Sequence, residues 1–129
     1  MDVPHDAVLL RIFMGVADRH RLLPLYQAIV LKAREMQLAG ATVLRGPLGF
    51  GQSATLHQGH LFPSAQNLPV VVEIVDIEEK INAFLPILDE MMEGGLVTME
   101  AARVLQYGCQ RTALLQRIKD QFGRHPHAQ

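Results

Sequence analysis

Apolar residues along the first third of the chain follow a strand-like spacing, then a helical one, then a strand-like one again. Residues 8–16 are rich in branched and aromatic side chains and predict a strand. Residues 24–39 place apolar side chains three or four positions apart and predict a helix. Pro24 suits its first turn and Gly40 the position just past its end. Residues 41–46 predict a second strand.

The same order of elements repeats further along the chain. Residues 69–76 predict a strand that begins with a proline, where proline is tolerated. Residues 77–93 predict a helix, in which Pro86 removes one backbone hydrogen bond and predicts a kink. The aspartate that ends the strand and Glu79 form a capping-box pattern at the start of this helix. Residues 96–99 predict a fourth strand.

The end of the chain has a weaker pattern. Residues 100–107 fit either a helix or a further extended segment. Residues 111–122 predict a helix, and the last seven residues predict a frayed end. We therefore treat residues 1–129 as a single domain, with a core at about 8–107 and a C-terminal extension at 108–129.

The order strand-helix-strand, repeated once, predicts a ferredoxin-like α+β sandwich. Its four-stranded antiparallel sheet would carry both helices on one face, with the first and third strands as the central pair. Both faces of these two strands are apolar, interrupted only by Arg11 and Glu73. The two helices would cover one face of the sheet, so something else must cover the other apolar face. A further copy of the chain would do so, and the C-terminal segment is the alternative.

Composition narrows the classes of protein. The formal net charge of -1 argues against a nucleic-acid binder, which needs a basic face to neutralise phosphates. The one cysteine, Cys109, excludes a disulfide within the chain and fits a cytoplasmic location. The N-terminus does not read as a signal peptide, and no segment approaches the ~20 apolar residues of a membrane span.

The segment RGPLGFGQSATLHQGHLFP, residues 45–63, connects the second and third predicted strands. It lacks the lysine of a Walker phosphate loop and the helix that follows a dinucleotide fingerprint. A connection this long is either functional or simply mobile, and both interpretations stay open. Arg45 at its start suits an anion, although a surface salt bridge explains an arginine there equally well. Gly46 would let a ligand approach the backbone.

Other chemistry is sparsely represented. His57 and His60 are three residues apart, but a metal site needs more ligands than these two, and we predict none. No nucleophile–base pair or carboxylate pair stands out, so we predict that the protein is not an enzyme.

Two stretches resemble a known family. PLYQAIVLKAREMQLAGATVLRGPLGFG and LPVVVEIVDIEEKINAFLPILDEMMEGGLVT are similar to the bacterial and archaeal family called domain of unknown function 190, in the PII-like signalling superfamily. The resemblance covers residues 8–107 and implies a homotrimer with its sheets packed inward. It also implies regulation by an adenine nucleotide (AMP, ADP or ATP) bound between subunits. The loop after the second strand would then engage a target protein, such as a membrane transporter.

The resemblance also implies which residues bind the nucleotide. They belong to the loop root, the loop and the turn before the fourth strand: Arg45, Gly46, Gly49, Phe50, Gly51, His57, Gly94 and Gly95. The basic phosphate ligands of PII proteins proper are absent, and Gln106 stands where relatives often carry a basic residue. Two other functions therefore stay open: a divalent-metal-binding trimer that uses His57 and His60, and an adaptor that binds a protein without a small effector.

Overall fold

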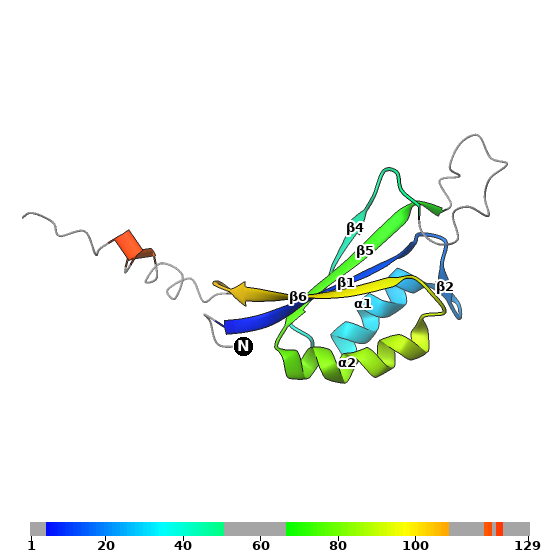
Figure 1. The fold of residues 1–129 in the computed structure, drawn as a ribbon. Coiled ribbons are helices and arrows are strands. Elements are labelled where there is room, and N and C mark those ends of the chain that lie inside the picture. The colour runs from blue at the N-terminus through cyan, green and yellow to red at the C-terminus, as the bar shows by residue number, and fades with distance from the viewer. Residues whose placement is uncertain (1–4, 51–66, 109–117, 120, 123–129) are drawn as a thin grey trace, which may run out of the picture.

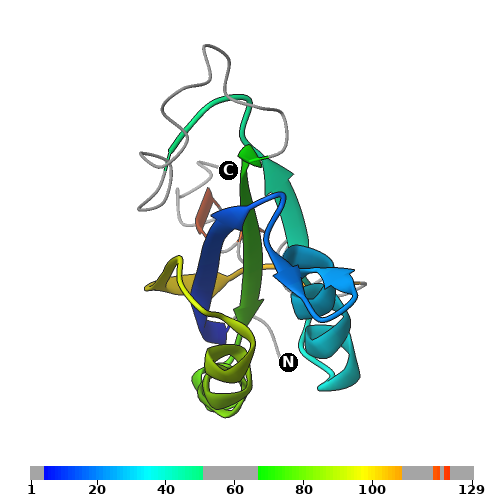
Figure 2. The ribbon, with the colours of Figure 1, turned by 90° about the vertical axis from the view of Figure 1, so that its right-hand side faces the viewer.

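The computed structural model describes residues 5–50, 67–108, 118–119 and 121–122. Four strands form one antiparallel sheet in the order β4-β5-β1-β6, and two helices lie on one of its faces (Figures 1 and 2). The elements are β1 (His5–Gly15), β2 (Arg19–His20), β3 (Leu23–Pro24), α1 (Leu25–Glu35), β4 (Thr42–Arg45), β5 (Pro69–Asp76), α2 (Glu78–Met91) and β6 (Leu96–Val104). This arrangement confirms the predicted α+β class and the central pair of strands.

The core lies between the helices and one face of the sheet. In the register of β1 with β5, Leu10 is opposite Ile74 and Ile12 is opposite Val72. Since directly opposite residues of an antiparallel pair share a face, these side chains point together toward the helices. The largest fully buried side chains are Leu10, Ile12, Ile29, Val70, Val72, Ile74, Ile81, Phe84 and Leu88. The structure therefore shows which of the two apolar faces of these strands forms the core, a choice that the sequence left open.

Helix α1 ends earlier than predicted, at Glu35 rather than residue 39. Gln37 adopts a left-handed conformation with φ 60°. Its N–H donates to the Arg34 carbonyl, and the Leu38 N–H donates to the Ala33 carbonyl. These two bonds are those of a Schellman motif, which normally uses glycine at the left-handed position. Because Gln37 takes that role, Gly40 does not end the helix.

The predicted capping box at the start of α2 is wrong. Ile77 is the N-cap residue, and no side chain caps the helix. The carboxylate of Asp76 is buried, with one oxygen accepting the Ile77 N–H at 2.7 Å and the other accepting the Ala39 N–H at 2.8 Å. Asp76 therefore ties the turn after α1 to the start of α2.

Other boundaries also differ from those predicted. Strand β6 continues to Val104, paired as far as His5, so residues 100–104 are strand. Backbone pairing of edge strand β6 with the long β1 makes these residues a strand, because their local sequence favours neither helix nor strand. The small β2–β3 hairpin was not predicted, and α2 runs through Pro86 to Met91. Most of the helix predicted at 111–122 lies outside the described residues.

The buried aromatic residue of α2 provides a test of this core. Phe84 is fully buried, and Phe84→Ala should lower the free energy of unfolding by about 3–5 kcal/mol through lost burial and a cavity. Phe50, 85% exposed, is the matched control, and Phe50→Ala should change it by less than about 0.5 kcal/mol. Urea unfolding followed by circular dichroism measures both; equal losses would contradict this packing.

Candidate ligand-binding site

Arg45 ends β4 and is held against an aromatic ring. Its Nη2 donates to the Tyr26 hydroxyl at 3.2 Å, and the guanidinium carbon lies 5.8 Å from the centre of that ring. Tyr26 stands in the first turn of α1. A guanidinium has five N–H donors, so one bond to Tyr26 leaves it able to bind an anion. Arg45 forms no salt bridge with another residue of the described part of the chain.

Tyr26 is a part of this site that the sequence did not indicate. In the sequence it reads as one apolar position of an amphipathic helix. Its contact with Arg45 joins a helix to an edge strand nineteen residues away, and only the tertiary structure creates it. The hydrogen bond and the ring contact both restrict the position of the Arg45 guanidinium.

The glycines after Arg45 are explained by packing against Pro69. The Gly46 N–H donates to the Pro69 carbonyl at 2.8 Å. A Cβ at Gly46 would lie 2.7 Å from Pro69 Cγ, and a Cβ at Gly49 would lie 3.0 Å from the same atom. The backbone therefore passes directly over the proline ring, and glycine permits this close approach. The sequence suggested a ligand as the cause, whereas the described neighbour is the first residue of β5.

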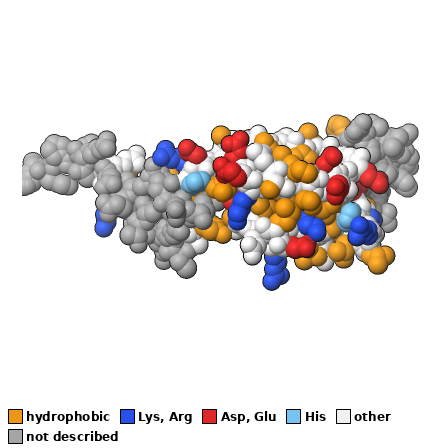
Figure 3. Space-filling model, turned by 90° about the horizontal axis from the view of Figure 1, so that it is seen from below, with side chains coloured by type: hydrophobic (Ala, Val, Ile, Leu, Met, Phe, Trp, Pro, Cys, Tyr) orange, Lys and Arg blue, Asp and Glu red, His pale blue; other side chains and the backbone are white. Residues whose placement is uncertain are grey.

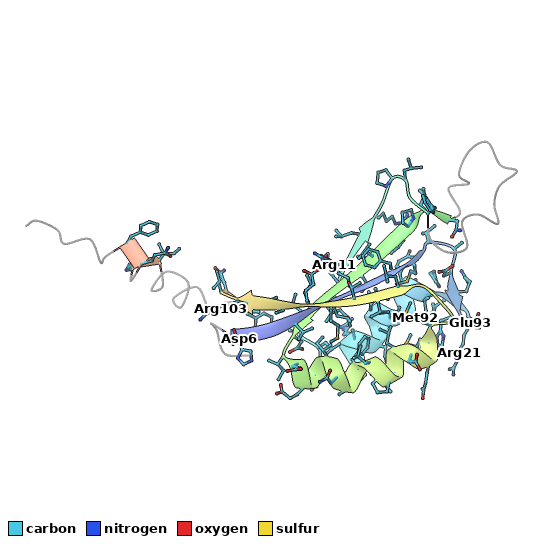
Figure 4. The ribbon with its side chains drawn as sticks, viewed as in Figure 1. Asp6, Arg11, Arg21, Met92, Glu93 and Arg103 are labelled. Atoms are coloured by element: carbon cyan, nitrogen blue, oxygen red, sulfur yellow. The ribbon has the colours of Figure 1, made fainter. Side chains whose placement is uncertain are left out.

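The turn before β6 contains Gly94 and Gly95, and its geometry requires glycine at the second of them. Gly95 has φ +106°, and a Cβ there would lie 2.7 Å from the Phe13 carbonyl oxygen. Gly94 has nothing within 4 Å of an added Cβ. The backbone at Gly95 therefore crosses the end of β1, while Gly94 faces open space. Met92 and Glu93 lead into this turn at the end of α2 (Figure 4).

The loop root and the glycine turn lie at the same end of the sheet but on opposite edges. Arg45 is opposite Val70 in β5, and Val70 is opposite Met14 in β1. Leu96, the first residue of β6, is opposite Phe13, so Gly95 falls beside Met14. Three strand spacings, roughly 14 Å, therefore separate the two pieces. Of the predicted site residues that the structure describes, one copy of the chain therefore keeps the loop root apart from the glycine turn.

The remaining predicted residues divide into two groups. Phe50 is described and its side chain is 85% exposed beyond Gly49. Gly51, His57 and His60 lie outside the described residues. Among residues that are described, no three histidine, cysteine or acidic side chains cluster as a metal site would require. The same residues contain no helix that is long and apolar enough to cross a membrane.

Sequence comparison establishes the family of this chain. Residues 7–104 match the model of domain of unknown function 190, described as "Uncharacterized ACR". A UPF0166 protein of Aquifex aeolicus is 40% identical over 100 residues, covering 75% of this chain and 91% of its own. A UPF0166 protein of Methanocaldococcus jannaschii is 33% identical over 99 residues, covering 76% and 91%. The chain belongs to the domain of unknown function 190 family.

Solved structures place the fold among PII-like proteins. A protein from Thermus thermophilus, provisionally assigned as a PII-like signaling protein, is similar with a TM-score of 0.54 and 18% identity. The match covers 77% of this chain and 89% of that one. CPII from Thiomonas intermedia, solved with ADP, AMP and acetate, is similar with a TM-score of 0.50 and 14% identity, covering 79% and 91%. At these identities the likeness is one of fold.

The two glycines of the turn before β6 are a matched pair for testing this geometry. Gly95→Ala forces a side chain into a conformation with positive φ and against the Phe13 carbonyl, so it should cost at least about 1–2 kcal/mol of the free energy of unfolding. Gly94→Ala places its methyl group in open space and should change it by less than about 0.5 kcal/mol. Denaturant titration measures both, and an equal effect of the two would refute the described turn.

Proposed function

We propose that this protein is a PII-like regulatory protein that binds an adenine nucleotide between subunits of a homotrimer. The observation that carries the proposal is the position of its two predicted half-sites on opposite edges of one sheet. A neighbouring copy would place its β6 edge beside the β4 edge of the first. The loop root of one subunit and the glycine turn of the next would then line one cleft.

One face of the sheet has no described helix or strand over it; we call it the uncovered face, and it supports the assembly. Leu9 and Phe13 in β1, with Val71 and Val75 in β5, point away from the helices and are only partly buried. Leu44 and Leu96 extend this apolar face to both edges and are 47% and 55% exposed. Charged side chains of both signs lie among the apolar ones on the opposite, helical side (Figure 3). Burying the apolar face between copies removes it from water.

A phosphate-bearing ligand fits the residue at the loop root. Arg45 presents a planar cation at a sheet edge, already positioned by Tyr26, and guanidinium groups bind phosphate oxygens in a bidentate manner. The structure of CPII with ADP and AMP, on a similar fold, supports an adenine nucleotide as the ligand class. AMP, ADP and ATP are therefore the compounds to test first.

Regulation would pass from the nucleotide to a protein target through the segment that follows the loop root, where Phe50 is exposed. A membrane transporter is one class of target that fits such a regulator. In this proposal the protein acts in the cytoplasm, binds no nucleic acid and catalyses no reaction. The metal-binding alternative depends on His57 and His60, and no described residue supports it.

The arginine at the loop root tests the ligand site. Arg45→Ala should weaken nucleotide binding by about 1.5–3 kcal/mol, as expected for a hydrogen bond to a charged group. Arg34→Ala, at the other end of α1 from Tyr26, is the control and should leave binding unchanged. Isothermal titration with AMP, ADP and ATP measures both. Unchanged affinity of the Arg45 variant, or no binding of any of the three nucleotides at millimolar concentration, would disprove the proposed site.

The mass of the protein in solution tests the assembly without any ligand. The chain mass is 14.4 kDa, and the proposal predicts a particle of about three times this value. Sedimentation equilibrium over a range of concentrations gives the mass directly. A stable monomer would contradict the assembly, since it would leave the apolar face of the sheet in water.

A further inference from the structure

A row of charged side chains crosses the uncovered face of the sheet between two apolar rows. Arg11 is opposite Glu73 in β5 and Thr98 in β6, so all three share this face. Arg11 points from the middle of the sheet away from the helices (Figure 4). One apolar row beside it contains Leu9 and Val75, with Glu100 at its β6 end, and the other contains Leu96, Phe13, Val71 and Leu44.

Arg11 is paired with two carboxylates at once. Its Nε donates to Glu73 Oε2 at 2.8 Å, and its Nη1 forms a salt bridge with Glu100 Oε1. The hydrogen bond to Glu73 is the main cause of a raised pKa of the guanidinium, and the charge of Glu100 adds to it. No titratable residue of β4 shares this row, where Thr42 is the neighbour of Glu73. Each copy thus carries one cation and two anions on this face, with Arg11 and Glu73 in one row and Glu100 in the next.

This charge arrangement constrains what can cover the face. The two apolar rows alone would accept a partner sheet at several offsets, because burial of apolar area is not directional. Arg11 and its two carboxylates are costly to bury unless they stay paired, so a covering surface must carry groups of both signs that fit over them. A second copy of this chain carries both signs in the same spacing and meets this requirement. Charge complementarity therefore favours another copy of the chain as the occupant.

We infer that the cluster of Arg11, Glu73 and Glu100 fixes the register of the subunit interface by exchanging ion pairs between copies. Glu100 would exchange the Arg11 of its own chain for that of the neighbouring copy, because it stands on edge strand β6 and its side chain is 56% exposed, against 35% for Arg11 and 27% for Glu73. This inference rests on the trimer proposed above. Beyond that trimer, it names the side chains that would select one packing of the sheets among several.

A charge-swapped variant distinguishes ion pairs between copies from pairs within one copy. The variant Arg11→Glu, Glu73→Arg, Glu100→Arg keeps opposite charges together within its own chain and within its own trimer. In a mixed trimer with the unchanged protein, like charges would meet across the interface. Unchanged and swapped chains, one of them labelled with nitrogen-15, are unfolded, mixed, refolded together and weighed by native mass spectrometry.

The expected result is self-sorting. Random assembly of equal amounts would place about three quarters of the trimers in the two mixed species. We expect these mixed species to fall at least tenfold below that share. The control swaps the Lys32–Glu35 pair, which is on α1 and away from this face, through Lys32→Glu and Glu35→Lys. This control variant should mix randomly with the unchanged protein.

Random mixing of the charge-swapped variant with the unchanged protein would overturn the inference but not the proposed trimer. An unchanged protein that is monomeric would instead overturn the proposed assembly, so the two failures are distinguishable. If the swapped variant does not fold, as judged by circular dichroism, Glu100→Gln replaces it, with Glu90→Gln on α2 as control. Glu100→Gln should raise the dissociation constant of the trimer at least fivefold, and an unchanged constant would refute the role of Glu100.

Discussion

The central strand pair, β1 with β5, has apolar side chains on both faces, and the chain provides helices for one of them. Ile12 and Val72 lie opposite each other in the core, whereas Phe13 and Val71, one residue away, lie opposite each other on the uncovered face. The hydrophobic effect acts on both faces alike, so the second face also needs to be removed from water. The proposed assembly follows from this constraint, and the proposed ligand site depends in turn on that assembly.

The order of the strands in the sheet decides where the two halves of the predicted site lie. Strands β4 and β6 are the two edges, and each brings one half of the predicted site to the same end of the sheet. The Arg45–Tyr26 pair provides a positioned cation at one edge, and Gly95 provides a close-packed turn at the other. A closed ring of copies joins unlike edges, so each cleft would receive one half from each neighbour.

The sequence predicted the sheet and its central pair correctly because a strand's period of two residues is visible in the apolar pattern, but both faces of that pair are apolar, so the pattern did not tell which face the helices cover. It misplaced features that depend on contacts between distant segments. Asp76 looked like a helix cap, but its carboxylate accepts the distant Ala39 N–H. The end of α1 was assigned to a glycine, but Gln37 makes the turn. In the candidate site, the sequence indicated Arg45 but not Tyr26, because the contact between the two forms only in the folded chain.

A crystal structure of the assembled protein with bound ADP tests most directly whether the nucleotide binds between two subunits. We expect the nucleotide between two copies, with its phosphates at Arg45 of one subunit and the neighbouring subunit's Gly94–Gly95 turn lining the same cleft. A nucleotide held by residues of a single subunit, away from both sheet edges, would contradict this expectation.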